Sequence, residues 1–178
     1  DGKKVTSIAN SAFSNCSNLG SITIPDSVTD IGNSAFSNCT ALTTIILPAS
    51  LERIGYNAFS SCINLKSITL PKSIKNIEEY AFDNCKSLTE ITIPNSVINI
   101  GDSAFSDCGS LTSVVIPDSV TNIGESAFYS CDSLASVTIS NSVTCIRKKT
   151  FENCSKLTSI TIPNSVTGIE AYAFDGCS

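Results

Sequence analysis

Residues 16–38 read CSNLGSITIPDSVTDIGNSAFSN, and the same 23-residue unit returns along the whole 178-residue chain. A phenylalanine marks every unit, at Phe13, Phe36, Phe59, Phe82, Phe105, Phe128, Phe151 and Phe174. A cysteine follows three residues later, at Cys16, Cys39, Cys62, Cys85, Cys108, Cys131, Cys154 and Cys177. A fixed period of about 20 to 50 residues is typical of a solenoid, in which each coil buries its apolar side only against its neighbours. The period therefore predicts a linear array of coils.

The composition excludes several classes of function. The chain has 11 Lys and Arg against 16 Asp and Glu, a net charge of −5, whereas nucleic-acid binding requires clustered basic residues. Histidine is absent, which excludes Ser-His and Cys-His nucleophiles and His-ligated metal sites built within this chain. No stretch approaches the roughly 18 consecutive apolar residues of a membrane span. We therefore expect a protein that is not an enzyme, with no cofactor, no metal site, no nucleic-acid partner and no membrane insertion within this fragment.

The limits of the chain bear on its organisation. We expect residues 1–178 to form a single array of about seven full repeats with partial units at both ends. The sequence opens at Asp1 inside a repeat and stops at Ser178, just after a repeat cysteine, so we expect a fragment of a longer chain. No signal peptide is present in this fragment.

The first half of the unit predicts a strand. Leu19, Ile22 and Ile24 follow the spacing L-x-x-I-x-I, and the two isoleucines alternate with Ser21 and Thr23. This period of two places isoleucines inward and hydroxyl side chains outward. Parallel stacking at about 4.8 Å per coil would then form one continuous sheet. Proline ends the strand in most units, because it fixes φ and lacks an N–H donor.

The second half of the unit predicts a turn, a second strand and a helical turn. Ser27, which recurs in every unit, is expected to point inward and to bind turn backbone in coil after coil. Val28 and Ile31 lie in a V-T-x-I segment typical of a short second strand. The segment 34–39 is long enough for one or two turns of α- or 3₁₀-helix, with the ring of Phe36 as a large wedge between coils.

Together these positions resemble the BspA-like leucine-rich repeats, whose pattern is roughly C-x-x-L-x-x-I-x-L-P-x-x-h-x-x-I-x-x-x-A-F, with h an aliphatic residue. The resemblance covers essentially the whole chain. It implies a β-rich α/β solenoid, a right-handed leucine-rich-repeat superhelix with one parallel sheet, short second strands and short helical or 3₁₀ turns. A straight parallel β-helix without helical turns is the alternative architecture. The resemblance also implies a secreted or surface-displayed protein of host-associated bacteria or some anaerobic protists, linked to adhesion to host matrix proteins and other cells.

The seventh unit departs from the pattern. Ser140 replaces the proline, Thr150 replaces the alanine, and Arg147, Lys148 and Lys149 replace a neutral or acidic turn. One interpretation is a local basic contact site, and the other, which we favour, is drift at solvent-facing positions.

The cysteines divide into two groups. The eight repeat cysteines would stack about 5 Å apart, which permits disulfides in principle, but each has equivalent neighbours on both sides and no pairing is specified. We favour buried free thiols over disulfides or a metal site. Cys145 stands where other units have polar residues or glycine, and we expect an exposed, odd thiol.

The candidate binding face consists of the outward side chains of the predicted sheet: Ser21, Thr23, Thr44, Ile46, Ser67, Thr69, Glu90, Thr92, Ser113, Val115, Ser136, Thr138, Ser159 and Thr161. This surface lacks the Tyr, Trp and Arg anchors of binding hot spots. It therefore favours weak contacts that gain strength by repetition, to a protein partner such as host extracellular matrix or another cell surface.

Three alternatives remain to this non-enzymatic adhesion module. The first is a structural spacer or stalk. The second is an ice-binding array of Ser and Thr, which Ile46, Glu90 and Val115 interrupt. The third is a polysaccharide-acting enzyme, which would need paired carboxylates across a cleft, whereas acids such as Glu78, Glu79 and Glu125 are expected as solvated turn residues.

Overall fold

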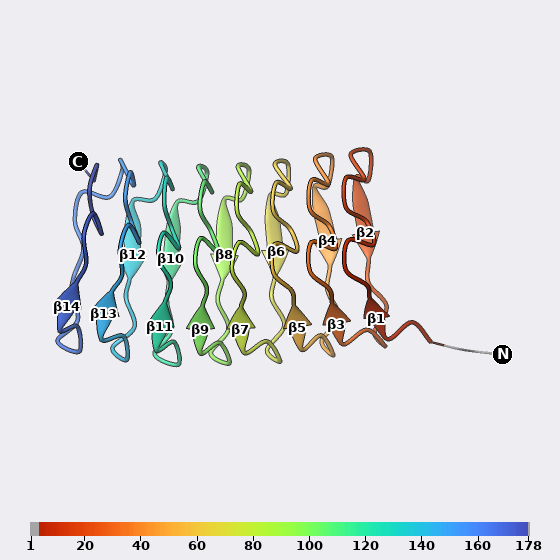
Figure 1. The fold of residues 1–178 in the computed structure, drawn as a ribbon, viewed down its shortest axis with the longest axis horizontal. Coiled ribbons are helices and arrows are strands. Elements are labelled where there is room, and N and C mark those ends of the chain that lie inside the picture. The colour runs from red at the N-terminus through yellow and green to blue at the C-terminus, as the bar shows by residue number, and fades with distance from the viewer. Residues whose placement is uncertain (1–3, 178) are drawn as a thin grey trace.

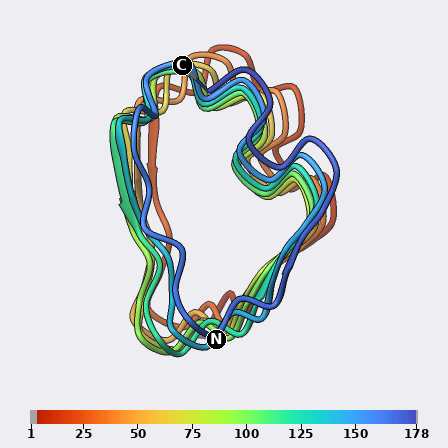
Figure 2. The same ribbon diagram turned by 90° about the vertical axis from the view of Figure 1, so that its left-hand side faces the viewer.

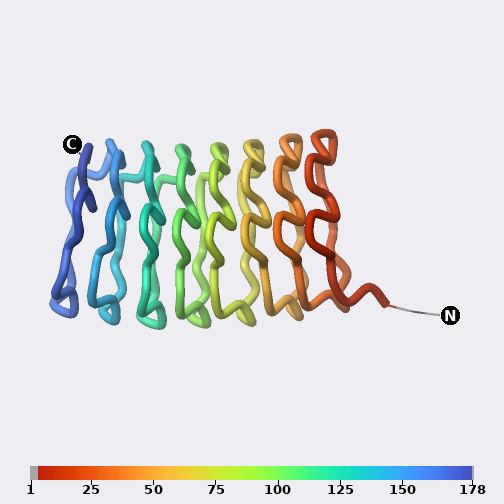
Figure 3. Tube along the Cα trace, viewed as in Figure 1, coloured from red at the N-terminus to blue at the C-terminus, as the bar shows by residue number. Residues whose placement is uncertain are grey.

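The computed structural model describes residues 4–177, and these form one row of stacked coils (Figure 1). Viewed along the row, successive coils superpose with a gradual offset (Figure 2). The tube along the chain shows a row that is close to straight (Figure 3). Residues 4–177 contain short strands and turns and no helix. The solenoid expected from the 23-residue period is confirmed. Its coils form a nearly straight row and contain no helix in residues 4–177, two features that were expected of the β-helix alternative.

Most coils carry two short parallel strands. The first ladder is formed by the three-residue strands β2 (Ser21–Thr23), β4 (Thr44–Ile46), β6 (Ser67–Thr69), β8 (Glu90–Thr92), β10 (Ser113–Val115) and β12 (Ser136–Thr138). The second ladder is formed by the two-residue strands β1 (Ser7–Ile8), β3 (Asp30–Ile31), β5 (Arg53–Ile54), β7 (Asn76–Ile77), β9 (Asn99–Ile100), β11 (Asn122–Ile123), β13 (Cys145–Ile146) and β14 (Gly168–Ile169). Pairing keeps the sequence period, so Ile22 lies beside Ile45 and Ile31 beside Ile54.

The sheet is interrupted, whereas the sequence suggested a continuous one. The first ladder pairs β2 with β4, β6 with β8, and β10 with β12, and the segment 159–161 is not a strand. The second ladder breaks between β5 and β7 and between β11 and β13. Each strand offers only two or three residues, so the loss of one or two hydrogen bonds ends a ladder.

The segment 34–39 forms consecutive turns in place of the expected helical or 3₁₀ turns. The N–H groups alternate between two acceptors: those of Ser37 and Cys39 donate to carbonyls three residues back, while that of Phe36 donates to Ala58 in the next coil. Ser34 and Asn38 have φ values of 55° and 59°, in the left-handed region. A right-handed helix cannot propagate through such residues, so each coil turns without becoming helical.

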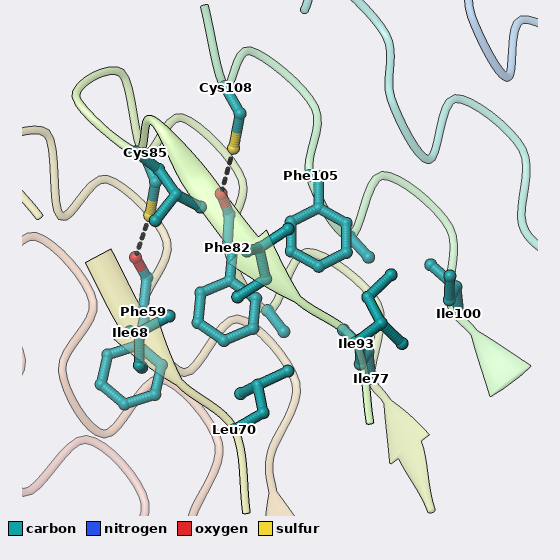
Figure 4. Packing of buried hydrophobic residues seen from close by; sticks show 14 of the residues in the cluster. Phe59, Ile68, Leu70, Ile77, Phe82, Cys85, Ile93, Ile100, Phe105 and Cys108 are labelled. Atoms are coloured by element: carbon teal, nitrogen blue, oxygen red, sulfur yellow. Dashed lines mark hydrogen bonds between the residues drawn. The ribbon is translucent and has the colours of Figure 1, made fainter. Parts of the chain in front are cut away.

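A stack of phenylalanine rings runs through the core. Neighbouring ring centroids lie 5.0–5.5 Å apart with interplanar angles of 2–12°. The six rings from Phe36 to Phe151 are completely buried, and the inward residues of both ladders pack against them (Figure 4). The stack and the buried aliphatic residues thus form one continuous linear core.

The serine that follows the first-ladder segment in each coil has a hydroxyl that is hydrogen-bonded in some coils and lacks a partner in others. The hydroxyl of Ser50 donates to the carbonyls of Asp26 and Val28 at 2.7 and 2.9 Å, and Ser142 donates to Asp118 at 2.6 Å. The buried hydroxyls of Ser96, Ser119 and Ser165 have no hydrogen-bond partner among residues 4–177. The expected serine ladder is therefore present only in part.

Candidate functional site

The outward side chains of the first ladder form a long exposed strip. In the first-ladder strands β4, β6, β8, β10 and β12, the middle residue is buried and both flanking residues are exposed, because successive side chains of a strand point to opposite faces. Ser159 and Thr161 continue the strip as exposed residues although their segment is not a strand. We call the following exposed residues the outer face: Ser21, Thr23, Thr44, Ile46, Ser67, Thr69, Glu90, Thr92, Ser113, Val115, Ser136, Thr138, Ser159 and Thr161.

Most of the outer face is small and hydroxylated, with three exceptions. Ile46 and Val115 expose 58% and 63% of their surface, and Glu90 is the one carboxylate. Neither ion pair found within residues 4–177 involves Glu90. A surface of this kind offers many weak hydrogen bonds, a few apolar contacts and one unpaired negative charge.

Grooves follow the interruptions of the first ladder. One of about 410 Å³ lies between β8 and β10, where no ladder joins the strands. A second of about 370 Å³ follows the ends of β4 and β6, and a third of about 240 Å³ lies between β12 and the segment 159–161. The outer face is therefore grooved between β8 and β10 and again beyond β12, whereas the groove near β4 and β6 lies past the ends of those strands.

The aromatic and basic side chains that dominate hot spots lie off the outer face. All four tyrosines and both arginines follow or belong to the second ladder: Arg53, Tyr56, Tyr80, Tyr129, Arg147 and Tyr172. The rings of Tyr56 and Tyr80 meet edge to face at 5.6 Å. The sequence already showed that the outer face lacks such residues, but it did not show that they share one side of the array.

Lys149 in the seventh unit is held by three neighbours. Its Nζ lies 2.9 Å from Glu152 Oε2 and 5.8 and 5.6 Å from the ring centres of Tyr129 and Tyr172. The hydrogen bond to Glu152 raises the pKa of this amine, so it stays charged. This basic residue is occupied by contacts within the array.

Two other departures of the seventh unit lie in the interior. Ser140 and Thr150 are completely buried, which corrects our interpretation that they drifted at solvent-facing positions. Ser140 donates to the carbonyl of Val120 at 2.7 Å and Thr150 to that of Arg147 at 2.8 Å. Each buried hydroxyl is therefore satisfied by backbone.

The repeat thiols are hydrogen-bond donors as well as core residues. All nine cysteines lie within residues 4–177 and are free thiols. Each repeat Sγ from Cys39 onward donates to the phenylalanine carbonyl 26 residues earlier, at 3.1–3.3 Å, as Figure 4 shows for Cys85 and Cys108. Burial raises the pKa of Cys62 and Cys154 to about 12. Sequence reasoning placed these thiols inside but missed their role as links between coils.

Cys145 is less accessible than expected. It is only partly exposed, and its Sγ lies 3.6 Å from Glu170 Oε1. Burial and then the Glu170 carboxylate raise the pKa of this thiol, and Arg147 lowers it in part. Cys16 and Cys177 are also partly exposed, so Cys145 is one of three such thiols.

The described part of the chain has neither a cluster of metal-ligating side chains nor a membrane-spanning helix. Residues 4–177 contain no group of three or more His, Cys, Asp or Glu arranged to hold a metal ion. No helix long and apolar enough to cross a bilayer occurs there.

Comparison with known proteins identifies the repeat. The family described as BspA type leucine-rich repeat region matches residues 2–108 and 52–178 with six copies. A leucine-rich repeat protein of Bacteroides ovatus is 32% identical with a TM-score of 0.76, over 97% of this chain and 56% of the other. A Treponema pallidum leucine-rich repeat protein is 35% identical with a TM-score of 0.70, over 99% of this chain and 72% of the other.

A third similar structure is that of a cell surface protein. A leucine-rich cell surface protein of Faecalibacterium prausnitzii is 27% identical with a TM-score of 0.50, over 99% of this chain and 72% of the other. The chain thus spans between about half and three quarters of the length of these proteins. No curated protein matches it significantly.

Proposed function

Because the chain belongs to the BspA-type leucine-rich repeat family, we propose that it is a non-enzymatic adhesion module that binds protein partners through its outer face. The observation that carries this proposal is the exposed strip of fourteen side chains on a rigid, regularly spaced array. We further propose a secreted or cell-surface location, supported by the similarity to a cell surface protein of this repeat type.

The chemistry of the face supports weak contacts that add up. Serine and threonine offer hydrogen bonds of modest net strength, about 0.5–1.5 kcal/mol each. Without aromatic or arginine anchors, a single copy gains little energy per contact. Several copies displayed together raise the effective concentration of each further contact, so avidity makes binding firm. Host extracellular matrix and other cell surfaces are repetitive partners that suit this mode.

The test is to compare monomeric protein with protein multimerised on beads, over a panel of matrix proteins and epithelial cells. We expect strong capture only by the multimer. Thr69→Lys, Glu90→Lys and Thr92→Lys together should abolish it by placing three long cations on the outer face. Glu52→Lys and Glu125→Lys together are the matched control, since they change the net charge by the same amount at exposed sites off that face.

Capture that is lost equally in the two sets of variants would show that net charge governs binding, and capture that both sets keep would show that the outer face is not used. Either result would refute the outer face. A multimer that captures nothing above a scrambled-face control would refute adhesion. The spacer alternative would then be the better account, because the unbroken phenylalanine stack suits a stiff rod.

A further inference from the structure

The groove between β8 and β10 differs chemically from the rest of the outer face. Glu90 lies on one side of it, and Val115, with 63% of its surface exposed, lies on the other. Buried Ile91 and Ile93 form the floor, while Thr92 and Asn95 add hydrogen-bonding groups. The groove therefore combines one anion, one apolar contact and neutral polar groups in about 410 Å³.

The negative charge in this groove has no partner in the array. Glu90 forms no ion pair within residues 4–177, and Lys66, the lysine that directly precedes β6 in the neighbouring coil, makes none with it. Thr92 on the same strand and Ser113 and Val115 on the adjoining strand are uncharged. A ligand cation would thus meet Glu90 without displacing a protein contact.

We propose that this groove binds an extended peptide segment that presents a lysine or arginine and, two residues later, a small aliphatic side chain. This inference rests on the proposed function and specifies the chemistry of the partner at one place on the outer face. The basic side chain pairs with Glu90, and the aliphatic side chain packs against Val115 and Pro117.

The spacing of the groove suits this pair of side chains. By the 23-residue period Thr92 corresponds to Val115, so Glu90 and Val115 lie one coil and two residues apart. With about 4.8 Å between coils and about 3.4 Å per residue, this diagonal is about 8 Å. Alternate side chains of an extended peptide lie on the same face about 7 Å apart, within reach of both residues. Thr92 and Ser113, which lie opposite Val115 and Glu90 on the two strands, can bond the peptide backbone.

The experiment uses three peptides: acetyl-Ser-Lys-Thr-Val-Ser-amide, the same peptide with Gln in place of Lys, and the same peptide with Ser in place of Val. Binding to the monomeric protein is followed by titration with NMR detection. We expect the Lys-Val peptide to bind at least fivefold tighter than either substituted peptide, and the preference over the Gln peptide to fall when salt screens the charge.

Two variants locate the binding. Glu90→Gln should remove the preference for Lys over Gln, and Val115→Ser should remove the preference for Val over Ser. Glu125→Gln, at an exposed site off the outer face, should change neither. Equal binding of the three peptides, or preferences unchanged in Glu90→Gln, would overturn the inference.

The outcomes separate this inference from the proposed function. Bead-bound multimer that still captures matrix or cells, with no peptide preference at Glu90, would leave adhesion standing and refute the groove. Peptide preference without multimer capture would support the groove and refute adhesion. Loss of both would refute both.

Discussion

Neighbouring coils are connected in one way by the turns equivalent to segment 34–39, which we call the turn side, and in another way by the strands of the first ladder. On the turn side, three N–H groups of each coil donate to the next at 2.7–3.2 Å, as Ser34, Phe36 and Asn38 do to Tyr56, Ala58 and Ser60. This set is unbroken from Ser11 to Asp175, whereas the first ladder is interrupted at every second coil. The backbone connection of the array is therefore strongest in its turns, and the strands are left free to vary on their outer side.

The turn side and the first ladder also differ in how many of their side chains are buried. The phenylalanine stack, the thiols and the small alanines all lie on the turn side and are completely buried in the central coils. The first ladder contributes one buried residue per strand and exposes its neighbours. Substitutions on the turn side should therefore cost stability, and substitutions on the outer face should change binding.

The largest expected effect comes from alkaline pH, which acts on all six buried repeat thiols. Their pKa is raised above the ordinary value of 9.0, and for Cys62 and Cys154 it reaches about 12. Below pH 9 both states keep the proton, so stability is fully present. Between about pH 9 and 12 Cys62 and Cys154 ionise only in the unfolded chain, so each of these two thiols lowers the free energy of unfolding by about 1.4 kcal/mol per pH unit. The other four thiols act in the same direction.

The measurement is the urea midpoint at pH 7.5, 9 and 10. We expect a steep loss above pH 9, and the double variant Cys62→Ala, Cys108→Ala should lose stability less steeply, because two of the six thiols are gone. A midpoint that is unchanged up to pH 10 would contradict the burial of the thiols.

A single ring gives the next largest effect. Phe82→Ala removes a completely buried side chain from the middle of the stack and should cost about 3–5 kcal/mol. Since each coil contacts only its neighbours, the defect should also let the two halves unfold separately. Calorimetry should show a lower and broader transition, whereas Thr92→Ala on the outer face should stay within about 0.5 kcal/mol of the parent.

Ser73 and Ser96 occupy the same position of the repeat in neighbouring coils but differ in their hydrogen bonds, so replacing each in turn tests how far equivalent positions differ between coils. Ser73 donates to the carbonyls of Ala49 and Leu51, whereas the buried hydroxyl of Ser96 has no partner among residues 4–177. Ser73→Ala should cost about 1 kcal/mol, because it removes bonds and leaves carbonyls unmet. Ser96→Ala should be neutral or stabilising. Equal losses in urea denaturation would contradict the difference between these coils.

The sequence predicted the coil and its inward and outward positions, because the 23-residue period and the alternation around Ile22 depend only on burial. It did not predict the unbroken hydrogen bonds of the turn side. Those require left-handed backbone at two positions per coil, and the residues found there include Tyr80 and Lys149, which carry no such preference. The breaks in the first ladder and the contacts of Lys149 with Tyr129 and Tyr172 also depend on packing between coils, which no single repeat encodes.

The smallest expected effect concerns Cys145, which lies in β13, away from the turn-side thiols. Burial and then the nearby Glu170 carboxylate raise the pKa of this thiol, so less thiolate is present at pH 8 than for a free cysteine. Glu170→Gln removes the charge, keeps an acceptor for the Lys148 N–H and should speed alkylation of Cys145 by iodoacetamide about two- to threefold. Mass spectrometry of the native protein at pH 8 measures the rate at each cysteine. Cys16 is the internal control and should be unaffected, since it lies at the other end of the array. A rate at Cys145 that does not change, or a parallel change at Cys16, would mean that Glu170 does not act on this thiol through its charge.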